Sequence, residues 1–314
     1  MGVHPQVQAL LEELISSGRP SSMSLPLPDG RRNFDELFQS LSSSAEVERT
    51  EDRIVPGPAG EVRVRVYTPS GKPPLPVVVF FHGGGWVFGG IEAYDGLCRA
   101  LASASRAVLV TVAFRLAPEH RFPAGLQDCY SVTEWVHANH AELRGDPARL
   151  AVAGDSSGAN LAAAVALMAR DRGGPPIAFL LLAYPAVDPE MASPSYRENG
   201  EDPFLSRAEM VWYWDQYLAS GGDRKDPYAA PLHAENLEGL PPTHIVTAGF
   251  DVLRDEGEAL AARLREAGVP VTLRRYDDMV HGFLIMGRYL DTARQGIEDV
   301  GRLLRQALAT PVRA

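Results

Sequence analysis

The sequence predicts an α/β protein built on a mostly parallel β-sheet with helices on both faces. Two observations carry this prediction. Short apolar runs that suit strands alternate along the chain with longer stretches of helical periodicity. Most of these apolar runs are also continuous, which is typical of strands buried on both faces. The length of 314 residues and the hydrophobic content of 45% are sufficient for a large core.

The first 45 or so residues lie outside this alternation. Apolar positions recur at helical spacing over residues 5–17, and Gly18-Arg19-Pro20 ends that helix. Residues 19–30 are rich in Ser, Pro and Gly and predict a loop, and a second short helix is predicted over 34–41. Because neither helix joins two strands, we expect an accessory layer.

From Glu61 the pattern changes to strand periodicity. Val62, Val64 and Val66 alternate with Arg or Tyr, which predicts a half-exposed antiparallel strand near a sheet edge. A continuous apolar run predicts a strand over 77–81 that is buried on both faces, and further candidate strands lie over 108–114, 150–153, 178–183, 244–248 and 271–276. The helical stretches are 93–105, 124–141, 158–171, 255–267 and 291–308.

Residues 186–232 interrupt the alternation. They contain no convincing core strand, and they hold a predicted helix over 206–218 that is rich in Trp and Tyr. An aromatic helix is usually a packing face. Because this one falls in an insertion between two strands, we expect it to cover part of the sheet.

The overall charge excludes some partners. A net charge of −10, a pI near 5.3 and the absence of a polybasic run argue against general affinity for nucleic acid or anionic lipid.

Cys98 and Cys129 fall in predicted helices, and two thiols make no disulfide framework, so free cysteines in a reducing cytoplasm are expected. No signal peptide and no apolar run of about 20 residues is present, which predicts a cytoplasmic protein without a membrane span.

Residues 150–160 contain the candidate nucleophile. An apolar strand runs into the turn Gly154-Asp155-Ser156-Ser157-Gly158, and an Ala-rich helix follows. This strand, turn and helix form the context of a nucleophile elbow, with Ser156 exposed at its tip. A Cβ at position 154 or 158 would collide with neighbouring backbone. The alternative is a glycine-rich turn with no catalytic role. The nucleophile interpretation therefore requires that other residues supply a base, an acid and an oxyanion site.

His281 and Asp251 are the residues that we expect to activate Ser156. A serine hydroxyl needs a His base held by a carboxylate, and after such an elbow the acid precedes the His in the chain. His281 follows the last predicted strand, where loops carry catalytic groups. Asp251 follows the strand over 244–248, whereas Asp255 is better explained as a charge at a helix start.

The loop His82-Gly83-Gly84-Gly85-Trp86 follows an early strand and is the candidate oxyanion site. Successive glycines let backbone approach a ligand closely, and an oxyanion needs two or three preorganised donors. We expect these donors to be the backbone N–H groups of Gly83, Gly84 and Ser157, with His82 organising the loop. A phosphate-binding loop is the competing interpretation, but neither glycine-rich phosphate motif is present. No metal is expected, because His-Glu-x-x-His spacing is absent and His137 and His140 lack partner ligands.

Together these motifs resemble those of the bacterial esterases of the hormone-sensitive-lipase-like family. The segments that carry the resemblance are His82 to Trp86, Gly154 to Gly158, Asp251 to Glu256 and His281-Gly282-Phe283, with Arg115 to His120 and Tyr184 to Asp188 between them. The resemblance spans about residues 50–290. Two departures are visible, because members commonly have Ala at the position of Ser157 and Tyr at that of Phe114.

The resemblance implies an α/β-hydrolase core with a sheet of about eight strands and a helical cap. It divides the chain into N-terminal cap helices (1–45), a first core part (46–185), a cap insertion (186–225) and a second core part (226–314). Trp86, Leu205 and Trp212 are expected to line the substrate pocket by position. The family commonly forms dimers, which implies a homodimer, and it uses no cofactor.

The predicted function is hydrolysis of short- to medium-chain acyl esters through an acyl-enzyme intermediate, with a small-molecule ester as substrate. The same chemistry leaves amides, carbamates and lactones open as substrates. A non-catalytic ligand-binding relative is the alternative from another class. Plant gibberellin receptors resemble this family but lose the His, so the presence of His281 disfavours that alternative.

Overall fold

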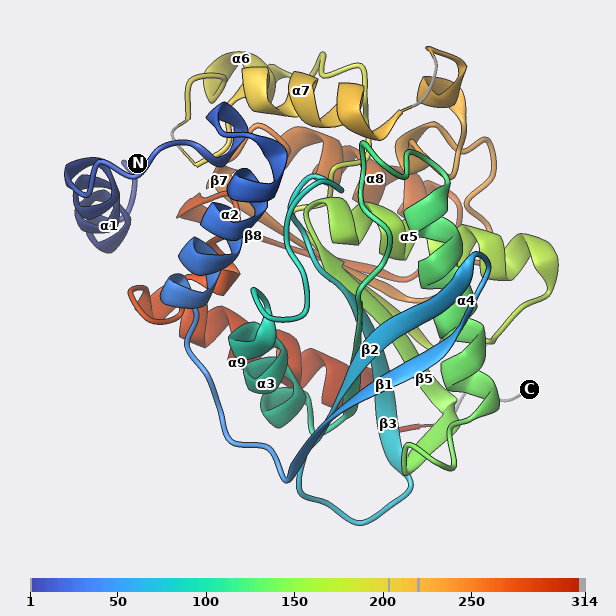
Figure 1. Ribbon diagram of the computed structural model, residues 1–314. Helices are drawn as coiled ribbons and strands as arrows, with labels where there is room; N and C mark the ends of the chain where they lie inside the picture. The colour runs from blue at the N-terminus through green and yellow to red at the C-terminus, as the bar shows by residue number, and fades with distance from the viewer. Residues whose placement is uncertain (1, 203, 219–220, 311–314) are drawn as a thin grey trace.

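The computed structural model describes residues 2–202, 204–218 and 221–310. In this part of the chain a single twisted sheet of eight strands has the order β1-β2-β4-β3-β5-β6-β7-β8 (Figure 1). The strands are β1 (Arg49–Gly57), β2 (Gly60–Thr68), β3 (Leu75–Phe81), β4 (Val108–Val112), β5 (Gly145–Asp155), β6 (Phe179–Ala183), β7 (Thr243–Phe250) and β8 (Val271–Val280).

The sheet is mostly parallel, as the sequence predicts. The strands β4, β3, β5, β6, β7 and β8 run parallel to one another, and β2 pairs antiparallel with both β1 and β4 near one edge. Strand β2 contains the predicted alternation, with Val64 and Val66 buried. The continuous run in β3 is buried on both faces, because Val77, Val78 and Val79 are each at most 1% exposed.

The helices form layers on both sides of this sheet (Figure 1). Helices α3 and α9 pack against each other on one face, and α4 and α5 pack together on the other. The helices are α1 (Pro5–Ser16), α2 (Leu27–Leu41), α3 (Asp95–Ser105), α4 (Ala124–Ala138), α5 (Ser157–Arg172), α6 (Pro194–Glu198), α7 (Arg207–Tyr217), α8 (Arg254–Glu266) and α9 (Asp291–Ala307). Short 3-10 helices cover Ser22–Ser24, Gly221–Lys225, Pro231–His233 and Phe283–Ile285.

Two elements differ from the expectation. Helix α2 begins at Leu27, whereas a loop was predicted up to residue 30. Pro28 lies in the first turn, where its missing N–H costs nothing, and Gly30 faces the Ser22 carbonyl oxygen so closely that a Cβ would collide with it. Strand β1 was not predicted, because it is an edge strand whose side chains are largely polar and exposed.

The insertion between β6 and β7 covers the end of the sheet at which the parallel strands finish. It carries α6 and α7, at the top of Figure 1, next to α2. Ser206 and Glu209 cap the start of α7 through reciprocal hydrogen bonds. Tyr217 of α7 stacks on Trp86, which follows β3, with ring centroids 4.2 Å apart. The aromatic residues of α7 therefore attach the insertion to the loop after β3.

Candidate active site

The turn after β5 is as sharp as the sequence predicts. Ser156 has φ 54° and ψ −122°, a strained conformation at the N-terminus of α5. A Cβ on Gly158 would collide with the carbonyl oxygens of Phe81 and His82, and one on Gly154 would collide with the Gly158 carbonyl. The two glycines are therefore required by close backbone approach. Together they hold the Ser156 hydroxyl at the carboxyl end of the sheet.

Three side chains from three strand ends meet at this point. His281 follows β8, and its Nε2 lies 3.0 Å from the Ser156 Oγ. Asp251 follows β7, is fully buried, and accepts a hydrogen bond of 2.8 Å from His281 Nδ1. The other oxygen of Asp251 accepts the Leu253 N–H at 2.9 Å. The structure therefore brings together the three residues that the sequence predicts, in hydrogen-bond contact.

The electrostatic environment raises the pKa of His281. Burial by itself lowers the pKa of His281, but the charge and hydrogen bond of Asp251, with further carboxylates at Asp155 and Asp202, outweigh burial. The net effect is a pKa above the ordinary value of 6.5. A raised pKa makes the imidazole a stronger proton acceptor and stabilises the imidazolium that forms when Ser156 loses its proton.

Other histidines that the sequence offered have structural partners. His82 donates from Nδ1 to the Gly83 carbonyl and stacks on Phe114, with ring centroids 4.4 Å apart. Burial lowers the pKa of His82 to about 4, so it is neutral and organises the loop. His244 contacts Thr272 at 2.7 Å within the sheet. The stack on His82 requires an aromatic ring at position 114 but no hydroxyl group, so either Phe or Tyr can make it.

Asp255 has the helix-start role that the sequence favours. It lies in the first turn of α8, accepts the Ser195 N–H at 2.7 Å and pairs with Arg254 at 2.7 Å. Its carboxylate is therefore occupied away from His281, and Asp251 is the acid in contact with the histidine.

The glycine-rich loop after β3 differs from the prediction at one position. The Gly83 N–H donates to Asp155 Oδ1 at 2.8 Å, so it is already used and does not fit the predicted donor role. Gly84 and Gly85 line the cavity beside Ser156 and His281, whereas Gly83 does not. The loop residues that face the cavity are therefore Gly84 and Gly85, and Gly83 is not among them. The third predicted donor, the Ser157 N–H, belongs to the first turn of α5, which leaves it without an intrahelical acceptor.

A cavity of 370 Å³ opens above Ser156. Its walls are mostly apolar and come from α1, α2 and α7, with Leu14, Leu37 and Phe38 on the N-terminal side. Leu205 lines it, as the sequence predicts, and so does the neighbouring Phe204. The placement of Trp86 and Trp212 in this wall is wrong. Trp86 is 2% exposed beneath α7, Trp212 stacks on Phe88, and neither ring lines the cavity.

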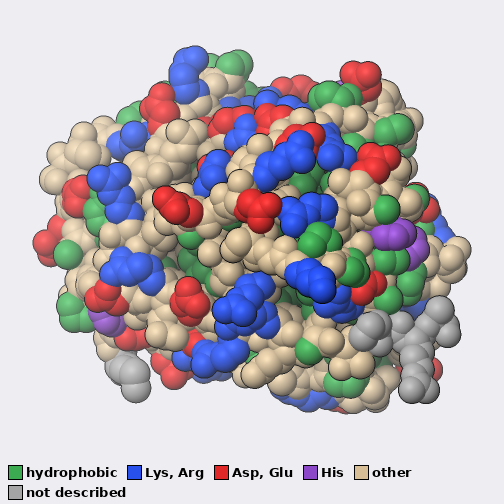
Figure 2. Space-filling view, turned by 90° about the horizontal axis from the view of Figure 1, so that it is seen from below, with side chains coloured by type: hydrophobic (Ala, Val, Ile, Leu, Met, Phe, Trp, Pro, Cys, Tyr) green, Lys and Arg blue, Asp and Glu red, His purple; other side chains and the backbone are tan. Residues whose placement is uncertain are grey.

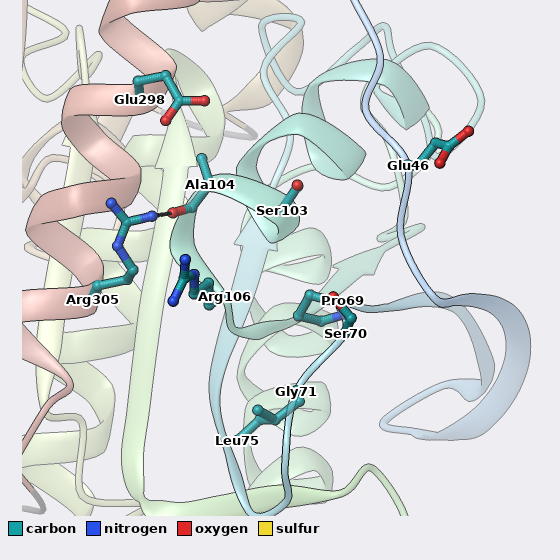
Figure 3. Close-up of a pocket in the computed structure, with 10 residues that line it drawn as sticks. All are labelled: Glu46, Pro69, Ser70, Gly71, Leu75, Ser103, Ala104, Arg106, Glu298 and Arg305. Carbon is teal, nitrogen blue, oxygen red and sulfur yellow. Dashed lines mark hydrogen bonds between the residues drawn. The ribbon is translucent and has the colours of Figure 1, made fainter.

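A larger cavity of 610 Å³ lies elsewhere, between the β2–β3 connection, α3 and α9 (Figure 3). Arg106, Arg305, Glu46 and Glu298 line it, and Arg305 donates to the Ala104 carbonyl (Figure 3). No histidine is among the residues that line it. The face seen from below mixes basic and acidic side chains (Figure 2), in keeping with the scattered basic residues of the sequence.

Two residues of the site were not predicted. Asp155 precedes the nucleophile, is 4% exposed, and accepts both the Gly83 N–H and the Tyr94 hydroxyl, the latter at 3.1 Å. Burial raises the pKa of Asp155 to about 7. Gly85 lies in the predicted loop, but the sequence pattern favours Gly83 and Gly84 as the donors. A polar residue next to the nucleophile was the available signal for Asp155, but its partners come from distant parts of the chain.

Known proteins with this fold and a similar sequence include carboxylic ester hydrolases. A family model described as the α/β hydrolase fold matches residues 78–285. The carboxylesterase NlhH of Mycobacterium tuberculosis is 45% identical over 267 residues, which cover 83% of each chain. An arylesterase of Saccharolobus solfataricus is 33% identical over 97% of this chain and 99% of its own. The solved structure of the ester-hydrolase EH1AB1 from the Lake Arreo metagenome superposes with a TM-score of 0.94 at 37% identity, covering 98% of this chain and all of that one. Among the described residues, no helix has the length and apolar character that crossing a membrane requires.

Proposed function

This chain belongs to the α/β-hydrolase family, in the branch of hormone-sensitive-lipase-like carboxylic ester hydrolases, and we propose that it cleaves short- to medium-chain acyl esters through Ser156, His281 and Asp251. One observation carries the residue assignment. An unbroken line of hydrogen bonds runs from Asp251 through His281 to Ser156, with contacts of 2.8 and 3.0 Å, and it ends at the floor of an apolar cavity.

The first step forms an acyl-enzyme. His281 accepts the Ser156 proton at Nε2 as Oγ attacks the ester carbonyl carbon, and the carbonyl electrons move to its oxygen. Asp251 fixes the tautomer with hydrogen on Nδ1 and stabilises the imidazolium. When the tetrahedral intermediate collapses, His281 returns the proton to the leaving alcohol. In the second step a water molecule gives a proton to His281 as its oxygen attacks the acyl carbon. The bond from that carbon to the Ser156 Oγ then breaks, His281 returns the proton to Oγ, and the acid leaves.

Backbone N–H groups hold the negative oxygen in both steps. We assign this role to Gly84, Gly85 and Ser157, because these residues lie next to Ser156 and the Gly83 N–H is bonded to Asp155. The N-terminus of α5 adds the positive end of a helix dipole. Loss of one such donor typically reduces turnover about 10²–10³-fold.

The size of the cavity supports a small substrate. At 370 Å³ it is near the lower end of the roughly 300–1,000 Å³ that is usual for ligand pockets. Its apolar side chains suit an acyl chain or an alkyl or aryl alcohol. Neither observation selects between the two sides of the ester.

Two measurements test the proposal. Ser156→Ala should remove p-nitrophenyl ester hydrolysis, whereas Ser131→Ala, at a partly exposed site with one long hydrogen bond of 3.4 Å, should leave it intact. Full activity in Ser156→Ala would overturn the assignment. Initial rates on p-nitrophenyl esters from acetate to palmitate should be highest at short or medium length, and a maximum at palmitate would instead indicate a lipase.

We also propose that the protein works in the cytoplasm as a homodimer. The cytoplasmic assignment rests on two buried, free cysteines, Cys98 and Cys129, which suit a reducing compartment. The homodimer rests on analogy with the family alone. Sedimentation velocity of the purified protein would show a monomer if this second proposal is wrong.

A further inference from the structure

Two hydrogen bonds join the residues on either side of the nucleophile to the residues on either side of the oxyanion donors. Asp155 Oδ1 accepts the Gly83 N–H at 2.8 Å, and Ser157 Oγ accepts the Trp86 N–H at 3.2 Å. Ser156 lies between the two acceptors, and Gly84 and Gly85 lie between the two donors. The loop is thus tied at both ends to the elbow.

The backbone of this loop has an uncommon conformation. Gly84, Gly85 and Trp86 have φ values of 112°, 61° and 61°, three successive residues in the left-handed region. For Trp86, which carries a Cβ, this conformation is unfavourable and persists only where the surroundings enforce it. Its ring is held by Tyr217 and Trp214 of α7, and its carbonyl accepts the Ala117 N–H at 2.9 Å.

The Trp86 N–H has its acceptor in the Ser157 hydroxyl. Trp86 is 2% exposed and Ser157 is 1% exposed, so water does not readily replace this bond. A buried backbone N–H without a partner is costly, and a loop that loses its acceptor moves to find another. With an alanine at position 157, which is common in the family, the Trp86 N–H would lose the side-chain oxygen that accepts its hydrogen bond here.

We propose that the Ser157 side chain is a positioning residue that fixes Gly84 and Gly85 at the distance from Ser156 at which their N–H groups bind the oxyanion. The inference rests on the proposed esterase function, and it assigns two separate roles to Ser157, one to its backbone and one to its side chain. Its backbone N–H is itself an oxyanion donor, and its hydroxyl holds the other two donors in place.

A matched pair of variants isolates the hydroxyl. Ser157→Thr keeps the oxygen and adds a methyl group, whereas Ser157→Val has the same shape and no oxygen. Any cost of the added methyl at this buried site is common to both. We expect kcat of the Val variant to be about tenfold below that of the Thr variant with KM unchanged, since displacing two donors acts on the transition state and costs less than losing one outright.

Two further readouts separate positioning from stability. An arylboronic acid, which forms a tetrahedral adduct with a nucleophilic serine, should bind the Val variant more weakly than the Thr variant by the same factor as kcat. Amide hydrogen exchange in the segment 83–88 should be faster in the Val variant. If either variant does not fold, Ser157→Ala compared with the wild type gives the same measurement without added volume.

The inference is overturned if the Val and Thr variants have equal kcat, or if their difference is confined to KM. The Ser156→Ala variant keeps this outcome distinct from failure of the proposed function. An inactive Ser156→Ala enzyme with equal Thr and Val variants rejects the role of the hydroxyl alone. An active Ser156→Ala enzyme rejects the esterase mechanism itself.

Discussion

Replacing Asp251 by Asn tests the contact between acid and base. In the structure one oxygen of Asp251 accepts the Leu253 N–H, and the other accepts His281 Nδ1–H. In Asp251→Asn the amide oxygen remains bonded to the Leu253 N–H, so the amide NH₂ faces His281 Nδ1. The histidine then carries its hydrogen on Nε2, where it cannot accept the proton of Ser156.

The magnitude follows from the charge that is lost. With contacting atoms 2.8 Å apart, the charge centres of the carboxylate and imidazolium are about 4 Å apart, where an effective dielectric of 20 gives an attraction of about 4 kcal/mol. Since 1.36 kcal/mol corresponds to tenfold in rate, we expect kcat to fall about 10³-fold, and further because of the wrong tautomer.

The assay is kcat and kcat/KM on a short p-nitrophenyl ester, measured between pH 5 and 9. Asp255→Asn is the matched control, because Asp255 is four positions further along and bonds to Ser195 and Arg254 instead. It should keep its activity. An Asp251→Asn enzyme within tenfold of the wild type, or an equal loss in Asp255→Asn, would refute the reasoning.

Three other predictions concern pH and stability. The pKa of His281 is raised above 6.5, and the neutral form is the base, so kcat/KM should fall as the pH drops through a value above 6.5; a midpoint below 6 in a pH–rate profile would contradict this. Gly158→Ala should abolish activity and lower Tm sharply, because its Cβ would strike two backbone oxygens at the end of β3, whereas Gly90→Ala, in open space, should have a much smaller effect in thermal melts. Arg115→Met removes the guanidinium that pairs with Asp128, whose side chain is 1% exposed, and leaves that buried carboxylate only the Arg115 backbone N–H. It should reduce the free energy of unfolding in urea by about 3 kcal/mol; a change below 0.5 kcal/mol, about the usual surface effect, would be evidence against it.

The sequence predicts the parallel part of the sheet well because its signals are local. Most of the strands from β3 to β8 hold a short apolar run, and the helices between them have a clear period. Local signals also explain the errors. Pro28 and Gly30 favour a loop when taken alone, yet one lies in the first turn of α2 and the other lets α2 approach Ser22. The edge strand β1 has no apolar run to reveal it.

The order of motifs along the chain determined the choice of Ser156, Asp251 and His281. Each follows a strand of a parallel sheet, and the carboxyl ends of such strands meet at one edge, so chain order and strand position were enough to select them. The tertiary structure gave the contact distances and the charges that raise the pKa of His281.

Only the tertiary structure showed which glycines of the loop face the cavity and which group the Ser157 hydroxyl contacts. A run of three glycines does not reveal which N–H points where, since that depends on an acceptor far along the chain. Asp155 takes the Gly83 N–H, which leaves Gly84 and Gly85 facing the cavity. Ser157 accepts the Trp86 N–H, and this contact is the basis of the role that we propose for the second hydroxyl in the elbow. Sequence order thus determined the reacting groups, and contacts between distant segments decided how they are held.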